Sequence, residues 1–193
     1  MRTPRLVLAS SSPRRRDLLT HAGYAFDVDP ADIDETMDVA ESALAATTRL
    51  ALQKAHVVLE RCGRDDVVLG ADTTVVVGGA ILGKPANVED AVEMLMSLSG
   101  RNHDVLTAWA VLHRGGGQSG VTRSIVRMRE ISRSTARAYA AGGEPLDKAG
   151  AYAAQGEGRR FIAAIAGAID NVIGLPVSPV AAALARAGVR PAT

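Results

Sequence analysis

A valine-rich segment in the middle of the chain limits the folds that are open to this sequence. Residues 66–77 read DVVLGADTTVVV, a run rich in β-branched residues that favours a buried strand. Gly78-Gly79 follows directly, a pair typical of a tight hairpin, and AILGKP then forms a short returning strand. The segment therefore predicts a β-hairpin, with one acidic residue, Asp72, inside its apolar run.

Asp72 requires a partner if this strand is buried. An uncompensated buried carboxylate costs several kcal/mol, so a cation, a metal ion or hydrogen bonds must stabilise it. The alternative is that one strand ends at this residue and that Asp72 caps a turn. We favour a functional carboxylate, with the hydroxyl group of Thr73 close to the same place.

Helical and strand patterns alternate along the rest of the chain. Because hairpins join neighbouring strands, the pattern predicts an α/β fold with a mixed β-sheet and flanking helices, not a purely parallel sheet. No linker separates two independent domains, so we expect one domain over residues 1–193. The other expected strands lie at residues 5–9, 24–28, 103–113, 120–131 and 160–167, and the expected helices at 13–22, 41–61, 87–99, 132–141 and 178–187.

Composition and charge exclude several classes of function. The net charge of +1 provides no overall field for nucleic acid or for an acidic membrane surface. No apolar run approaches the roughly twenty residues of a membrane span, and the run Leu6–Ala9 is too short for the core of a signal peptide. The single cysteine, Cys62, rules out an internal disulfide. We expect a cytoplasmic protein.

The segment LASSSPRRRDLL, residues 8–19, has the features of an anion site. Three serines and a proline stand between a predicted strand and a predicted helix, where backbone N–H groups are available to an anion. Ser10 adds a hydroxyl donor, and Arg14 and Arg15 add charge with a geometry suited to phosphate. The alternative is a basic surface patch beside an ordinary helix cap at Ser12.

Two lysines are candidates for binding phosphate. Gly78, Gly83 and Lys84 fit the first seven positions of a P-loop, but Pro85 stands where Ser or Thr should hold magnesium. Pro85 also favours an extended conformation at the preceding residue, so we reject the P-loop and keep Lys84 as a point charge. Lys54 lies beside the apolar stripe of a long helix, and from this position alone we expect its ammonium group to reach water.

The remaining candidates are weaker by themselves. The acidic run DIDET, residues 32–36, either supplies oxygen ligands to a divalent cation or is a solvated loop. Gln155, in a polar glycine-rich segment, has both a donor and an acceptor for base recognition, but a plain surface loop is the simpler interpretation. The four histidines show no metal-ligand spacing, and no nucleophile elbow is present.

Taken together and in order, the motifs resemble one family. The chain is similar to the Maf nucleoside triphosphate pyrophosphatases, also called septum-formation-inhibitor-like proteins, over about Leu8–Pro176. The motifs that carry the resemblance are LASSSPRR, DIDE, RLALQKA, LGADT, LGKP, MLMSLSGRNHDVLTA, EPLDKAGAYAAQG and NVIGLP.

The resemblance implies a fold and an activity. Members of the family cleave a nucleoside triphosphate between the α and β phosphates, use a divalent metal (Mg²⁺, Mn²⁺ or Co²⁺), and are often homodimers with a nucleotide cleft between two lobes of a mixed-sheet α/β fold. Asp72 corresponds to the proton acceptor and, with Glu35, to a metal ligand. The phosphate and metal site would also include Ser10, Arg15, Lys54 and Lys84.

The resemblance also implies a branch of the family. Arg14, Thr73 and Gln155 match the branch that acts on dTTP and UTP, and these residues would bind substrate. The sequence departs from the family at Trp109, where a smaller apolar residue is common, and at AGAIDNVIGLP. The expected cellular role is control of the nucleotide pool or arrest of cell division. Two alternatives are a non-catalytic regulator of septum formation, which binds a nucleotide or a partner, and a relative that acts on purine triphosphates.

Overall fold

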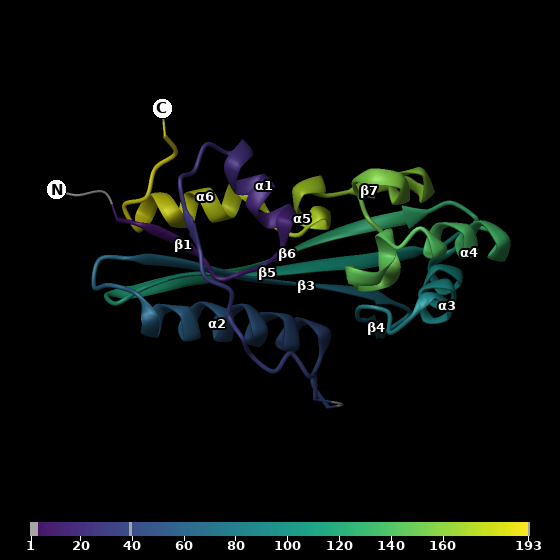
Figure 1. Ribbon diagram of the computed structural model, residues 1–193, viewed down its shortest axis with the longest axis horizontal. Helices are drawn as coiled ribbons and strands as arrows, with labels where there is room; N and C mark the ends of the chain where they lie inside the picture. Colours follow the sequence, from purple (N-terminus) through teal and green to yellow (C-terminus); the bar gives the residue numbers. More distant parts are fainter. Residues whose placement is uncertain (1–3, 39, 193) are drawn as a thin grey trace. The chain divides into compact units, whose positions relative to one another are not determined.

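The computed structural model describes residues 4–38 and 40–192 and contains a mixed β-sheet with flanking helices (Figure 1). The strand order is β2-β1-β3-β5-β6-β7, and β4 pairs with β3. The strands are β1 (Leu6–Leu8), β2 (Asp27–Val28), β3 (Val67–Val77), β4 (Ala80–Leu82), β5 (Asn102–His113), β6 (Gly116–Met128) and β7 (Ile162–Ala166).

The pairing of the strands confirms the predicted mixed sheet. β1 runs parallel to both β2 and β3, whereas β3 with β4 and β6 with β7 are antiparallel. The turn between β3 and β4 has positive φ angles of 57° at Gly78 and 84° at Gly79. Two consecutive residues at positive φ are what a type I′ hairpin turn requires, which explains why glycine occupies both positions.

The chain divides into two compact units. The described residues of unit 1 are 4–38, 40–72, 107–122 and 174–192, and unit 2 comprises 73–106 and 123–173. β3, β5 and β6 each contribute residues to both units. The prediction of one domain over residues 1–193 stays a prediction.

Unit 1 is built on the alternation of side chains along β1 and β3. In Figure 1, α2 (Ala43–Arg61) lies on one side of these strands, and α1 (Pro13–His21) and α6 (Val177–Arg186) lie on the other. Leu8 and Leu69 belong to a buried cluster with residues of α1 and α6, whereas Val7 and Val68 pack with residues of α2. Successive residues of a strand face opposite sides of the sheet, so both faces of these strands are apolar.

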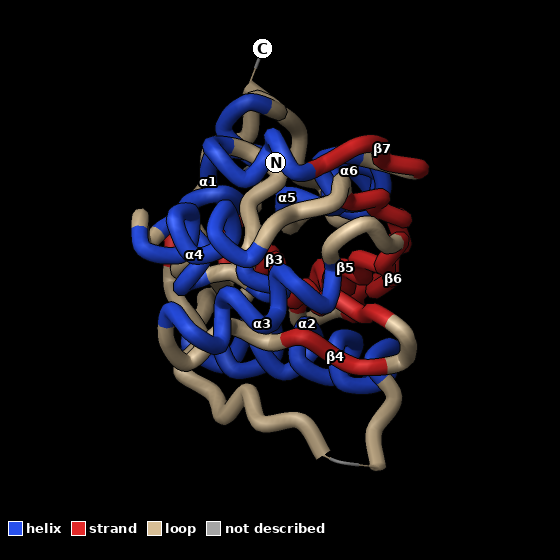
Figure 2. Tube along the Cα trace, turned by 90° about the vertical axis from the view of Figure 1, so that its right-hand side faces the viewer, coloured by secondary structure: helices blue, strands red, loops and turns tan. Residues whose placement is uncertain are grey.

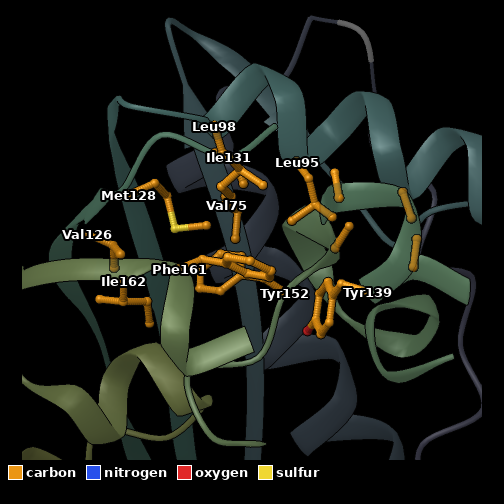
Figure 3. Close-up of a cluster of buried hydrophobic side chains, with 14 of the residues drawn as sticks. Val75, Leu95, Leu98, Val126, Met128, Ile131, Tyr139, Tyr152, Phe161 and Ile162 are labelled. Carbon is orange, nitrogen blue, oxygen red and sulfur yellow. The ribbon is translucent and has the colours of Figure 1, made fainter. Parts of the chain in front are cut away.

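Unit 2 has its own core. α3 (Val88–Leu98) and α4 (Arg133–Ala141) contact each other, as Figure 2 shows, and three short 3₁₀ helices follow: η1 (Glu144–Asp147), η2 (Ala149–Ala151) and η3 (Gly156–Phe161). A short helix, α5 (Ile169–Ile173), ends the unit. The buried cluster of this unit joins Val75 and Leu95 to aromatic residues from the 3₁₀ region (Figure 3).

Several predicted boundaries were wrong. The strand expected at 24–28 is reduced to Asp27–Val28, and the strand expected from residue 120 begins at Gly116. The last helix begins at Val177, and α5 was not predicted. The cap signals were better guides: the Asn87 side chain accepts a hydrogen bond from the Asp90 N–H (2.9 Å), as expected at the start of α3.

Both departures from the family pattern fit into the structure. Trp109 is buried, and a Cβ at Gly120 would lie 2.7 Å from its indole ring, so Gly120 makes room for the larger side chain. Asn171, in the second departing segment, is buried and donates hydrogen bonds to the Val105 carbonyl (3.1 Å) and the Ser124 hydroxyl (3.0 Å).

No helix among the described residues is long and apolar enough to cross a membrane.

Candidate active site

The loop between β1 and α1 holds a buried arginine beside a serine. Arg15 is only 9 % exposed; its Nε donates to the Gly174 carbonyl (2.9 Å) and its Nη1 donates to the Ser10 hydroxyl (3.0 Å). The Ser12 N–H also donates to the Ser10 hydroxyl (3.2 Å). Ser12 occupies the N-cap position of α1, as predicted, although its side chain makes no capping hydrogen bond. The structure thus places Ser10 and Arg15 together at a helix start, as an anion site requires.

The surroundings of Arg15 shift its pKa in both directions. Burial lowers the pKa of this guanidinium group, and the nearby carboxylates of Asp72 and Glu35 oppose that effect by raising it. The neighbouring positive charge of Arg14 lowers the pKa as well. Arginine stays protonated in proteins, so a buried positive charge faces this site.

Lys54 joins the two acidic residues of the predicted site. Its Nζ lies 2.7 Å from Asp72 Oδ1 and 2.7 Å from Glu35 Oε1. Lys54 is 6 % exposed and Asp72 is 8 % exposed, so this is a buried ion pair. The expectation that the Lys54 ammonium reaches water was wrong: it turns to two carboxylates because an unpaired Asp72 would carry a large desolvation cost.

The local packing of β3 explains why Asp72 reaches Lys54. The contacts with α2 come from every second residue of the strand, namely Val68, Gly70 and Asp72, because such residues share one face. A Cβ at Gly70 would lie 2.4 Å from the Ala51 carbonyl oxygen and 2.7 Å from the Ala55 nitrogen, both backbone atoms of α2. Glycine therefore allows the strand to approach the helix closely, one helical turn from the Lys54 side chain.

The acidic run DIDET contributes one of its residues to the cluster. Glu35 pairs with Lys54, while the Asp34 carboxylate accepts hydrogen bonds from the N–H (2.9 Å) and hydroxyl (2.5 Å) of Thr36. Arg49 of α2 holds the loop: it donates to the Thr36 carbonyl (3.2 Å) and pairs with Glu41 (2.7 Å). We did not single out Arg49 from the sequence, although it lies within the motif RLALQKA.

Glu35 and Asp72 have the chemistry of ligands for a hard divalent cation. Both carboxylates lie against a single ammonium group, which keeps them close to each other. Magnesium is commonly held by one or two carboxylates, with substrate phosphates and water completing its shell. No group of three or more His, Cys, Asp or Glu side chains in the described part of the chain is suited to a metal ion. The residues present thus fit a magnesium-like ion that substrate helps to hold.

The other predicted substrate residues are Arg14 in unit 1 and Thr73, Lys84 and Gln155 in unit 2. Arg14 is half-buried in α1, and Thr73 is half-buried in β3. Lys84 is exposed after β4, and α3 begins only at Val88, which agrees with the rejection of a P-loop.

Gln155 is exposed and directly precedes η3. Within unit 2, the Gly150 N–H donates to the Gly83 carbonyl (3.0 Å), which ties the segment before Lys84 to the segment before Gln155.

A cavity of about 550 Å³ lies elsewhere in unit 1, between α2 and the end of the β5–β6 hairpin. Leu52, His56, Leu112 and His113 are among its lining residues. None of the sequence-predicted site residues lines it.

Comparison with known proteins identifies a family and close relatives. The family model described as Maf-like protein matches residues 5–187. A dTTP/UTP pyrophosphatase from Myxococcus xanthus (strain DK1622) is 50 % identical, over 95 % of this chain and 92 % of the relative. A dTTP/UTP pyrophosphatase from Hahella chejuensis (strain KCTC 2396) is 45 % identical, over 96 % of this chain and 94 % of the relative. Among solved structures, a HAM1 protein from Coxiella burnetii shows a weak similarity, with a TM-score of 0.47 and 16 % identity over 67 % of this chain and 74 % of that chain.

Proposed function

The chain belongs to the Maf-like protein family, and from this premise we propose that it is a nucleoside triphosphate pyrophosphatase that acts on dTTP and UTP. The reaction hydrolyses the bond between the α and β phosphates and yields the nucleoside monophosphate and pyrophosphate. The observation that carries the proposal is the cluster of Glu35, Lys54 and Asp72: one buried ammonium group serves the buried carboxylate of Asp72 and the exposed carboxylate of Glu35, and buried charges of this kind gather at functional sites.

Ser10, Arg15 and Lys54 bind the triphosphate in this proposal. The Ser10 hydroxyl and the first turn of α1 supply hydrogen-bond donors, and the guanidinium of Arg15 supplies a positive charge fixed by the Gly174 carbonyl. Phosphoryl transfer depends mainly on positioning and on stabilisation of charge, so donors held in place before substrate arrives are suited to it.

Glu35 and Asp72 would hold a divalent cation, namely Mg²⁺, Mn²⁺ or Co²⁺. When bound, such an ion supplies positive charge to the phosphate oxygens and orients them. Asp72 also orients the attacking water and accepts its proton. Its ion pair with Lys54, at 2.7 Å, holds the carboxylate in place for this role.

Arg14, Thr73, Lys84 and Gln155 complete the proposed substrate contacts. Arg14 and Lys84 add positive charge for the phosphates, and Thr73 and Gln155 select the pyrimidine. The resemblance at the motifs that contain these residues supports the assignment.

We also propose that the protein acts as a cytoplasmic homodimer, with residues 1–193 forming one domain. Light scattering would test the dimer, and a single cooperative unfolding transition would test the domain.

The decisive experiment measures pyrophosphate release from a panel of nucleoside triphosphates with Mg²⁺, Mn²⁺ or Co²⁺. Asp72→Asn should lower kcat by a factor of about 10²–10⁴ without unfolding the protein, because general base catalysis contributes that much. Asp66→Asn is the matched control: Asp66 is also buried and paired, with Arg5 at 2.5 Å, but it directly precedes β3, whereas Asp72 lies in the middle of the strand. The control should stay within a few-fold of wild type.

The other outcomes are equally informative. Turnover of purine triphosphates in preference to dTTP and UTP would contradict the proposed substrate class. Tight binding of nucleotide without any product would contradict the enzyme and favour a non-catalytic regulator of septum formation. Activity of Asp72→Asn within a few-fold of wild type would exclude this residue as the proton acceptor.

A further inference from the structure

The loop that carries Gln155 is held on both sides by two residues of unit 2. On one side, the Ala153 N–H donates to the hydroxyl oxygen of Tyr139 (3.2 Å). On the other side, the N–H groups of Glu157 (3.0 Å) and Gly158 (3.1 Å) donate to the two carboxylate oxygens of Glu144. Gln155 stands between these attachments, two residues after Ala153 and two residues before Glu157.

The two holding residues are themselves connected. The Tyr139 hydroxyl donates to Glu144 Oε1 (2.9 Å), so the phenol links the carboxylate to the Ala153 N–H. The Tyr139 ring is buried and packs edge-on against Phe161, with ring centroids 5.1 Å apart, and Figure 3 shows both side chains in the core of the unit. A phenol fixed in the core and a carboxylate bonded to it form a rigid clamp, which we call the Tyr139–Glu144 clamp.

The charge of Glu144 suits this arrangement. Burial raises the pKa of its carboxyl group, but the N–H groups of Gly158 and Glu157 and the Tyr139 hydroxyl outweigh burial, so that the pKa lies below its ordinary value. The carboxylate is therefore ionised at neutral pH and accepts all three hydrogen bonds. Bonds of this kind to a charged acceptor are stronger than those between neutral groups.

The glycines around Gln155 fit the clamp closely. Gly156 has a φ of +76°, and a Cβ at this position would lie 2.8 Å from Glu144 Oε2. A Cβ at Gly158 would lie 2.6 Å from the Tyr139 hydroxyl oxygen. Only glycine allows the loop backbone to approach both clamp residues, so the sequence QGEG and the clamp depend on each other.

We propose that Tyr139 and Glu144 are positioning residues that set nucleobase selectivity by fixing the backbone on both sides of Gln155. The inference deepens the proposed function and rests on it. Uracil and thymine present a donor at N3, where cytosine presents an acceptor. The Gln155 side chain can still rotate, but a fixed backbone holds its Cα in one place and so sets how closely the amide can approach the edge of a uracil or thymine, whereas a mobile loop would let the amide adjust to cytosine as well. The clamp thus turns the adaptable amide of Gln155 into a selective one.

Glu144→Gln tests the proposal through the ratio of kcat/KM for UTP to kcat/KM for CTP. The amide cannot accept from both the Glu157 and Gly158 N–H groups and from Tyr139 as the carboxylate does, so the ratio should fall roughly tenfold. The loss should be mainly in the KM for UTP, with kcat within a few-fold of wild type. Glu157→Gln is the matched control: it removes a charge from the same loop, but its exposed side chain lies 4.0 Å from Arg160 and the clamp uses only its backbone N–H. The control should keep the wild-type ratio.

A double-mutant comparison separates positioning from general damage. If Glu144 acts through Gln155, then Glu144→Gln should change the UTP/CTP ratio in the wild-type background and leave it unchanged in the Gln155→Ala background. Tyr139→Phe, which removes the hydroxyl but keeps the buried ring, should resemble Glu144→Gln. An equal loss of kcat for both nucleotides with an unchanged ratio would overturn the proposal, because it would indicate a merely structural role.

Amide hydrogen exchange tests the clamp without relying on activity. The N–H groups of Ala153, Glu157 and Gly158 should exchange faster in Glu144→Gln than in Glu157→Gln, while the rest of unit 2 stays protected. Equal protection in the two variants would overturn the clamp itself. If wild type hydrolyses no nucleotide, both the proposed function and the selectivity role fail, and the exchange experiment still decides whether the loop is clamped.

Discussion

Gly70→Ala is the change that most directly tests how the fold positions Lys54 and Asp72 of the proposed site. The new Cβ would lie 2.4 Å from the Ala51 carbonyl oxygen and 2.9 Å from the Ala55 Cβ, whereas ordinary contact begins at about 3.4 Å. Since the nearest atoms belong to the backbone of α2, the strand and the helix must separate by about 1 Å. Lys54 and Asp72 stand on those two elements.

The magnitude of the effect follows from this displacement. The Lys54 Nζ to Asp72 Oδ1 distance is 2.7 Å, so an additional 1 Å takes the pair beyond hydrogen-bond distance. A misplacement of about 1 Å in a catalytic site costs on the order of 10² in rate, and overpacking costs about 1–3 kcal/mol in stability. We therefore expect kcat/KM for dTTP to fall about a hundredfold in a protein that still folds.

The assay combines steady-state pyrophosphate release with urea unfolding, so that the activity is corrected for the folded fraction. Gly115→Ala is the control, because the added Cβ there meets only the movable side chain of His113. It should change neither quantity appreciably. If Gly70→Ala keeps kcat/KM within threefold of wild type at full folding, the close approach of β3 to α2 does not position the pair, and the reasoning is refuted.

Two further predictions concern stability. Lys54→Met should destabilise the protein by about 3–5 kcal/mol in urea unfolding, because it leaves the buried Asp72 without its cation. Adding Asp72→Asn should restore much of that loss, and a double variant no more stable than Lys54→Met alone would contradict this explanation. Burial lowers the pKa of His103 to about 4, below its unfolded value, so the unfolded state binds more protons between the two values. The contribution of neutral His103 to the free energy of unfolding is thus fully present above the unfolded pKa. The free energy of unfolding should fall by about 2 kcal/mol from pH 7 to pH 5, and His103→Gln should reduce this loss. Chemical-shift titration of the imidazole checks the pKa directly, and a value near 6.5 would exclude this contribution.

Local signals predicted well wherever the deciding interactions are close in sequence. The Gly78-Gly79 turn and the Asn87 cap both appear in the structure because the backbone conformation of two to four residues decides them. The buried strand around Asp72 was predicted for a similar reason, since a run of valines is itself the apolar surface that the sheet buries. The strand at 24–28 was overestimated because its pairing depends on β1, which offers only Leu6–Leu8.

The sequence by itself determined which charged residues needed an explanation, and the family resemblance placed Asp72, Lys54 and Glu35 in one site. Only the tertiary structure decided how they meet. From its helix alone, Lys54 was expected to reach water, because no local pattern shows that Gly70 brings β3 against α2 and that one ammonium serves two carboxylates. The Tyr139–Glu144 clamp was equally hidden, since its bonds join α4, η1 and η3. Side-chain type limits which partners a buried charge can accept, but the packing of distant segments selects the partner.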